Sequence, residues 1–365
     1  MQPHVSRVWN FSAGPAAMPQ EVLDRAQREM LEWNGSGSSV MEQSHRGKRF
    51  VEMAAQTEAD LRTLMGISAD YAVLFLQGGA TQLFAQIPMN LAAEGDSADY
   101  IDTGHWSSKA ISEAAPYLHV NVAASAKADD YRRIPKRDNW QLDPGAAYVH
   151  YTPNETIHGV EFHEVPDVGT VPLVADMSSS ILSEPLDVSR FGLIYAGAQK
   201  NIGPSGLVVM IIRRDLRERA GRPMAKIFRF AEQAANDSML NTPNTWGWYL
   251  AGLTFQWLHA LGGLSVMAER NRAKAELLYS TIDGSSGYYR NPIDVSARSR
   301  MNVPFTLHDS ALDATFLKEA ETAGLLALKG HKAVGGMRAS LYNAVPLEAV
   351  QALTAFMRDF AQQHG

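Results

Sequence analysis

The 365-residue sequence contains no cysteine. Without thiols the chain forms no disulfide bond, no thiolate metal site and no cysteine nucleophile, so cysteine proteases and zinc fingers are excluded. We expect no bound metal. The lack of cysteine also favours a reducing compartment, which leads us to expect a cytoplasmic protein.

An excess of positive charge is also missing, since the formal net charge is −6. This balance argues against a nucleic-acid partner, so an anionic ligand would have to be held by a local cluster of cations. Apolar runs such as "GLVVMII" are far too short to cross a bilayer. The start, "MQPHVSRVWNFSAGPAAMP", lacks the pattern of a secretory signal. We therefore expect no membrane partner.

What the sequence does contain is an alternation of strand-like and helix-like segments. Residues 71–95 read as an apolar strand, a glycine-rich turn and an amphipathic helix opened by Thr81, and residues 97–117 repeat this order. Further short apolar runs end in polar residues within 146–162, 171–181, 191–200 and 206–213. Such runs predict an α/β fold with a mostly parallel sheet buried between helices.

The pattern changes after Asn241. A long helical stretch, 245–283, is interrupted at Gly262 and Gly263, which indicates a connector between two domains. Beyond it, a strand within 298–307, a helix within 309–324 and a terminal helix over 346–365 predict a smaller C-terminal α+β domain. We predict an N-terminal segment over 1–15, a large domain over 16–260 and a small domain over 261–365.

Two charged residues follow buried runs of the predicted sheet. Asp176 ends "VPLVAD", and Lys200 ends "FGLIYAGAQK" before the turn "NIGPSG". Each has a simple explanation alone, because a lysine is often solvated in a turn and an aspartate often caps one. On neighbouring strands, however, both side chains would open towards the carboxyl edge of the sheet, where ligands of such folds bind.

Three other turns add complementary groups. Gly78 and Gly79 precede a helix whose backbone N–H groups could hold a phosphate, although any tight turn uses glycine. Trp106 could stack on a planar ring or pack in the core, and Thr156 could donate a hydrogen bond or simply form a polar turn.

Together these groups describe a site for a phosphorylated, planar heteroaromatic aldehyde that reacts with a lysine, which is pyridoxal phosphate. A free lysine has a pKa of about 10.4, so reaction near pH 7 needs that pKa lowered by burial or nearby cations. Asp176 would pair with the protonated ring nitrogen and keep the ring electron-withdrawing.

Basic residues cluster in two glycine-containing loops. His45 and Arg46 lie in "SHRGKRF", and His331, Lys332 and Arg338 lie in "LKGHKAVGGMRAS". Basic side chains are usually solvated, but in an acidic chain these could hold a doubly anionic substrate.

The motifs of the chain resemble those of a known family. The motifs are "NFSAGPAAMP", "VMEQSHRGKRF", "LQGGATQLF", "DTGHWSSKA", "TPNETIHGVEF", "ADMSSSILSEPLDVSRFGLIYAGAQKNIGPSGLVVMIIR", "LNTPNTW" and "LKGHKAVGGMRASLYNA". They span nearly the whole chain, which therefore resembles the phosphoserine aminotransferase family of fold-type I pyridoxal phosphate enzymes. The resemblance implies a homodimer with active sites at the subunit interface.

The same resemblance implies a role for each matching residue. Lys200 corresponds to the lysine that forms the Schiff base, Asp176 to the partner of the pyridine nitrogen, Trp106 to the stacking ring and Thr156 to the contact of the ring hydroxyl. The cofactor phosphate would be surrounded by Gly79, Ala80, Thr81 and Gln199, with Asn241 and Thr242 reaching over from the neighbouring subunit. The substrate anions would be bound by His45, Arg46, His331, Lys332 and Arg338. Lys332 departs from the arginine expected there and offers a point charge instead of a bidentate fork.

The resemblance implies a reversible ping-pong transamination. It would convert glutamate and 3-phosphohydroxypyruvate to 2-oxoglutarate and O-phosphoserine in serine biosynthesis, and it leaves open the related 4-phosphohydroxythreonine reaction of pyridoxine biosynthesis. Two alternatives stay open at this point. One is another fold-type I enzyme, such as a serine–glyoxylate type aminotransferase, since a cysteine desulfurase would generally need a cysteine. The other is a non-catalytic binding protein for phosphate esters, which would need no reactive lysine.

Overall fold

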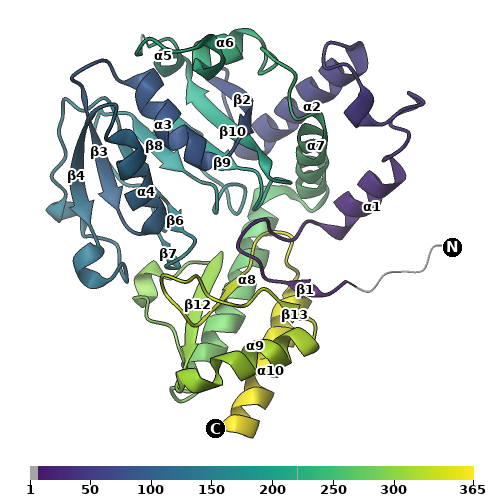
Figure 1. Ribbon diagram of the computed structural model, residues 1–365, viewed down its shortest axis with the longest axis vertical. Helices are drawn as coiled ribbons and strands as arrows, with labels where there is room; N and C mark the ends of the chain where they lie inside the picture. Colours follow the sequence, from purple (N-terminus) through teal and green to yellow (C-terminus); the bar gives the residue numbers. More distant parts are fainter. Residues whose placement is uncertain (1–6, 220) are drawn as a thin grey trace.

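A seven-stranded sheet forms the centre of the larger lobe of the molecule (Figure 1). The computed structural model describes residues 7–219 and 221–365. The order across the sheet is β2 (Tyr71–Gly78), β10 (Gly206–Arg213), β9 (Leu193–Gly197), β8 (Leu173–Asp176), β5 (Val149–Tyr151), β3 (Ser97–Asp102) and β4 (His119–Ser125). Strand β10 is antiparallel to both of its neighbours, and the other pairs are parallel. The predicted α/β fold with a mostly parallel sheet is confirmed.

Helices cover both faces of this sheet. One face packs against α3 (Ala80–Leu91), α4 (His105–Ala114), α5 (Arg214–Arg217) and α6 (Phe230–Ala235), and the other against α1 (Gln20–Arg28), α2 (Lys48–Met65) and α7 (Thr245–Ala260). Strand β10 shows why its sequence is apolar throughout. Val208, Met210 and Ile212 face the first set of helices, whereas Val209 and Ile211 face the second.

Two details of the predicted strand and helix ends are wrong. Strand β9 ends at Gly197, so Lys200 lies in the turn that follows and does not end the strand. Helix α3 begins at Ala80, preceded by Gly79, and not at Thr81. Both errors are small because glycine and polar turn residues leave the last residue of an element weakly determined.

The smaller lobe is an α+β unit, as predicted. Its antiparallel sheet has the order β11 (Tyr289–Arg290), β12 (Asn302–Leu307) and β14 (Met337–Ser340), and it packs with α9 (Asp313–Thr322) and α10 (Leu347–His364). The N-terminal strand β1 (Trp9–Asn10) pairs in parallel with β13 (Leu325–Leu326), and Phe11 enters the same core. Residues 1–6, which include part of the predicted N-terminal segment and of the expected non-secretory start, lie outside the described residues. The domain boundaries stay predictions.

Helix α8 (Gly263–Asp283) joins the two lobes. Its first turns contribute Leu264 and Met267 to the core of the larger lobe, and its later turns contribute Leu278 and Ile282 to the core of the smaller one. The predicted interruption before it is confirmed, because α7 ends at Ala260 and the glycines at 262 and 263 both have positive φ, at 103° and 82°.

Candidate active site

The predicted lysine lies in a pocket at the carboxyl edge of the sheet. Its walls follow the ends of β2, β3, β5, β8 and β9, which is where ligands of α/β sheets bind. The residues that line it are Gly79, Ala80, Thr81, Trp106, Thr152, Asn154, Thr156, Asp176, Ser178, Ser179, Gln199 and Lys200. The structure thus brings together eight of the predicted residues, from five separate stretches of sequence.

Lys200 is held by contacts from three directions. Its Nζ donates a hydrogen bond of 2.6 Å to Thr156 Oγ1 and lies 5.8 Å from the centre of the Trp106 ring. The N-terminal loop passes beside it, because Ala16 N donates to Gln199 O at 2.9 Å. Burial lowers the pKa of Lys200 to about 8, with the nearby charges of Asp176 and Glu155 acting in the opposite direction.

Asp176 is the acid of the pocket. Ser178 donates to its Oδ1 twice, from the backbone N at 3.0 Å and from Oγ at 2.6 Å. Both bonds end on Oδ1, which leaves Oδ2 for a donor in the pocket. Burial raises the pKa of Asp176, while the bonds from Ser178 and the charge of Lys200 oppose the rise. Ser178 in turn accepts a bond from Gly197 N at 3.0 Å, which ties the carboxylate to the end of β9.

Several residues of the pocket were not predicted. Asn154, in β6 (Asn154–Glu155), donates to Ser179 Oγ at 2.9 Å and, across the lobes, to Asn302 Oδ1 at 2.8 Å. Neighbouring Glu155 has no exposed surface and accepts hydrogen bonds from the start of α4. The available signal was a run of polar residues, "TPNET", directly after a buried strand.

Two of the predicted substrate residues reach the rim of the pocket from the smaller lobe. Arg338 Nη1 donates to Thr156 O at 3.5 Å, and burial lowers the pKa of Arg338. The ring of His331 lies 5.7 Å from that of His105, which directly precedes Trp106. Burial lowers the pKa of His331, as do the nearby charges of His105, Arg338 and Lys332. Lys332 itself is exposed beside them.

The other predicted residues do not line this pocket within one chain. His45 and Arg46 lie in the turn before α2, and Arg46 is exposed. Gln77 donates to Thr242 O at 2.6 Å, and Asn241 lines a separate cavity beside the β2–α3 turn. A single chain therefore supplies the cofactor-side groups and leaves these four residues apart.

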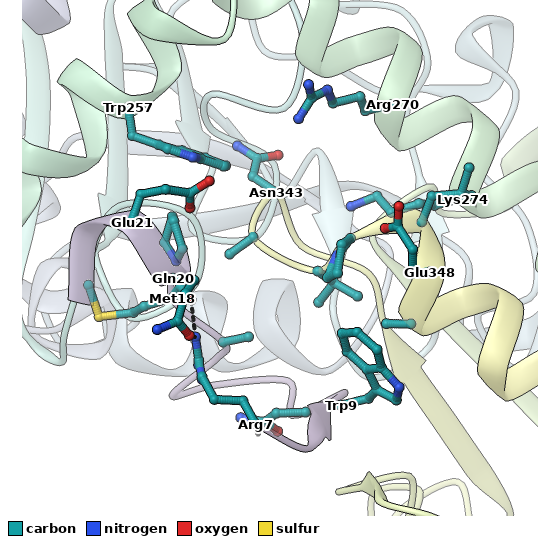
Figure 2. Close-up of a pocket in the computed structure, with 18 of the residues that line it drawn as sticks. Arg7, Trp9, Met18, Gln20, Glu21, Trp257, Arg270, Lys274, Asn343 and Glu348 are labelled. Carbon is teal, nitrogen blue, oxygen red and sulfur yellow. Dashed lines mark hydrogen bonds between the residues drawn. The ribbon is translucent and has the colours of Figure 1, made fainter. Parts of the chain in front are cut away.

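A second and much larger cavity lies between α7, α8 and the start of α10 (Figure 2). It measures about 970 Å³, against about 120 Å³ for the pocket around Lys200. Trp9 and Trp257 line it, together with charged residues of both signs. Lys274 is buried there and donates to Leu341 O at 2.7 Å and Tyr342 O at 2.8 Å. The residues that line this cavity include none of the predicted site residues.

Among the residues that the structure describes, no helix is long and apolar enough to cross a membrane. The same residues contain no group of three or more His, Asp or Glu side chains arranged to hold a metal ion.

Comparison with known proteins connects the chain to a family. The profile of the class-V aminotransferases matches residues 8–353. A phosphoserine aminotransferase of Stenotrophomonas maltophilia is 62% identical over 361 residues, which cover 99% of this chain and all of that protein. Among solved structures, the phosphoserine aminotransferase of Bacillus circulans subsp. alkalophilus is 47% identical with a TM-score of 0.97, covering 98% of this chain and 99% of that one. The pyridoxal phosphate-bound enzyme of Trichomonas vaginalis is 44% identical with a TM-score of 0.92, covering 96% and 100%.

Proposed function

The chain belongs to the class-V aminotransferases and, within them, to the phosphoserine aminotransferases, and from this we propose that it transfers an amino group from glutamate to 3-phosphohydroxypyruvate. The products are O-phosphoserine and 2-oxoglutarate, and the pathway is serine biosynthesis. The enzyme depends on pyridoxal phosphate. The observation that carries the proposal is the partly buried Lys200 amine, 2.6 Å from Thr156 Oγ1, in a pocket that Asp176 also lines.

The residues present fit this cofactor. Trp106 and Thr152 each have a buried polar atom, Nε1 and Oγ1, without a hydrogen-bond partner in the described part of the chain, as expected of a pocket made for a polar ligand. A β-carbon added to Gly79 would meet no other atom within 4 Å, so the backbone before α3 is open on the pocket side. The first N–H groups of this 12-residue helix suit a phosphate.

The bound cofactor supplies a reactive aldehyde and a ring that accepts the electron pair left when Cα of the substrate loses a proton. Lys200 moves that proton at its Nζ, and a pKa of about 8 leaves part of the amine neutral near pH 7.5. We propose that Asp176 keeps a proton on the ring nitrogen and that Thr156 orients the lysine amine. Trp106 closes one face of the pocket and excludes water from it.

Substrate recognition is the second part of the proposal. We assign the carboxylate of the substrate to Arg338, whose guanidinium forms a planar fork, and its phosphate to the region of His331 and Lys332. His45 and Arg46 lie apart from the pocket of their own chain, so we propose that they complete the pocket of a second subunit in a homodimer. Asn241 and Thr242 would meet the cofactor phosphate of that subunit in the same way.

A titration of the visible absorption band tests the proposal. O-phosphoserine should bleach the band of the enzyme at a far lower concentration than unphosphorylated serine does. An equal response to both would keep the cofactor and Lys200 but move the substrate to that of another aminotransferase. A protein that stays colourless with added pyridoxal phosphate would leave only binding of phosphate esters. The same titration with 4-phosphohydroxythreonine tests the second substrate, which we propose because it carries the same two anionic groups.

A further inference from the structure

Glu155 is a buried acid beside the active site that the reaction described above does not use. Its side chain has no exposed surface, and it lies in β6 directly before Thr156, the residue that accepts the hydrogen bond from Lys200. We propose that Glu155 is a positioning residue of the cofactor site, which holds Trp106 in place and helps to keep the proton on Lys200. The inference rests on the proposed dependence on pyridoxal phosphate but not on the identity of the substrate.

The first observation is the way in which Glu155 binds the start of α4. Its Oε2 accepts a hydrogen bond of 3.0 Å from Trp106 N, and its Oε1 accepts two of 2.8 Å, from Ser107 N and Ser107 Oγ. The residue before the helix, Gly104, has no side chain with which to cap these groups. A carboxylate from a distant segment therefore takes the place of the usual helix cap.

The glycine at position 104 allows the carboxylate of Glu155 to come close to the start of α4. A β-carbon added there would lie 2.5 Å from Cδ of Glu155, too close for any side chain. Glycine is thus required for the carboxylate to reach the helix. Since Trp106 is the second residue of α4, the same bonds position its backbone, and the centre of its ring lies 5.8 Å from Lys200 Nζ.

The second observation is electrostatic. Burial lowers the pKa of Lys200, and two negative charges oppose this change. The charge of Asp176 has the larger effect and that of Glu155 the smaller one. Burial raises the pKa of Glu155 to about 7, while its three hydrogen bonds favour the ionised form. Other titratable groups near this carboxyl are Asp176, Asp102 through Ser107, Tyr131, and His105 and His158 at the helix start.

Ionisation of Glu155 therefore has two effects. Above about pH 7 the carboxylate accepts all three bonds and places a negative charge near Lys200. Below that pH one oxygen carries a proton and becomes a donor that faces N–H donors. The hydrogen bonds that hold the backbone of Trp106 therefore weaken. The position of the aromatic ring and the proton affinity of the lysine thus change together.

Replacing Glu155 by glutamine tests both effects. In Glu155→Gln we expect the pH midpoint of the visible absorption band to move to lower pH, because the lysine nitrogen loses a nearby negative charge. We also expect pyridoxal phosphate to bind on the order of tenfold more weakly, since an amide cannot accept from both N–H groups without offering its own donor to one of them. Neither readout uses the phosphorylated substrate, so failure of the substrate assignment would remain separate.

Two further variants make the result decisive. Glu155→Asp keeps the charge on a side chain one methylene shorter, so the midpoint should stay near that of the parent enzyme while cofactor affinity falls. Asp99→Asn is the matched control, because Asp99 is also fully buried, on β3, and accepts from Asn121 Nδ2 at 2.7 Å and Asp143 N at 2.8 Å, away from the pocket. Its loss should lower thermal stability and leave midpoint and affinity unchanged.

The inference fails if Glu155→Gln behaves like Asp99→Asn, with lower stability but an unchanged midpoint and unchanged cofactor affinity. If Glu155→Gln does not fold, Ser107→Ala replaces it, since this change removes one of the three donors and leaves the carboxylate in place. Cofactor binding should then weaken by a few fold. Unchanged binding in that variant would equally overturn the proposal.

Discussion

Two lysines, the partly buried Lys200 and the buried Lys274, allow the proposed catalytic pocket to be compared with the larger cavity. Burial lowers the pKa of both, to about 8 for Lys200 and to about 7 for Lys274. The amine of Lys274 donates hydrogen bonds to two backbone carbonyls. The amine of Lys200 donates one to a hydroxyl and lies near the charges of Asp176 and Glu155.

The difference shows what sets the proposed reactive lysine apart from another lysine of lowered pKa. Neither the lower pKa nor the larger cavity identifies it, since both belong to Lys274. The distinguishing feature is that an acid, an aromatic ring, a hydroxyl and a helix start line the same pocket as the Lys200 amine. Convergence of this kind arises where neighbouring strands end together. A perturbed pKa alone shows only that a group is removed from water. The side chains around the group indicate whether it has a function.

Removal of the Lys200 amine should have the largest effect on this comparison. In Lys200→Ala we expect turnover to fall by at least about 10⁴-fold, because the group that transfers the proton is lost. Steady-state kinetics measures the loss, and circular dichroism should show an intact fold. Normal turnover in this variant would contradict the assignment of Lys200.

The acid of the pocket should have the next largest effect. In Asp176→Asn the residue no longer holds a charge opposite the ring nitrogen, so we expect kcat to fall by about 10²-fold to 10³-fold. Cofactor absorption measured alongside kcat separates loss of chemistry from loss of the cofactor. A kcat within a few fold of the parent value would remove Asp176 from this role.

Arg338 tests the substrate side of the pocket. In Arg338→Ala we expect KM for O-phosphoserine to rise by on the order of tenfold to a hundredfold, since a charge-assisted hydrogen bond to the carboxylate is lost. The affinity for pyridoxal phosphate should change much less. An unchanged KM would show that the substrate carboxylate binds elsewhere.

Lys274→Met gives the opposite pattern to Lys200→Ala. The carbonyls of Leu341 and Tyr342 lose their donor, and we expect the free energy of unfolding to fall by about 1–3 kcal/mol. Turnover at a temperature where the protein is folded should stay within a few fold of the parent value. A collapse of turnover with an intact fold would place Lys274 in the catalytic machinery and end the contrast.

The smallest expected effect is on the pH dependence of stability. Since the pKa of Lys274 is about 7 in the folded protein and its ordinary value is 10.5, the unfolded chain binds more protons between these values. Stability should therefore rise with pH across that window. Urea unfolding at pH 7 and pH 9 should show a smaller gain in Lys274→Met than in the parent. An equal gain in both would show that other groups, such as Lys200, account for the slope.

The general fold was predictable because its signals are local. Continuous apolar runs ending in polar residues indicated buried parallel strands, and the two glycines after α7 indicated the helix break. The antiparallel direction of β10 depends on the strands beside it, and the end of β9 at Gly197 depends on its pairing with β10. Neither could be predicted from the local sequence of these strands.

The site was predictable where a residue's type suffices. Lysine and aspartate after buried strands stand out, as does a tryptophan in a polar turn. Glu155 did not stand out, because its role depends on a helix start 49 residues away in the chain. The same holds for Asn154 and its bond to Asn302 in the other lobe. The roles of all the predicted site residues stay predictions, and those of His45, Arg46, Asn241 and Thr242 would in addition concern a second subunit.

The pairing of β1 with β13 has a consequence for the order in which the molecule folds. Trp9 pairs with Leu325, and Phe11 is buried in the same core. These residues are synthesised early, but their contacts can form only after nearly the whole chain has been made. Contacts so distant in sequence form slowly, because a long loop must close before they are gained. On the ribosome, the sheet of the larger lobe can assemble first, and the smaller lobe closes last by taking up the N-terminal strand.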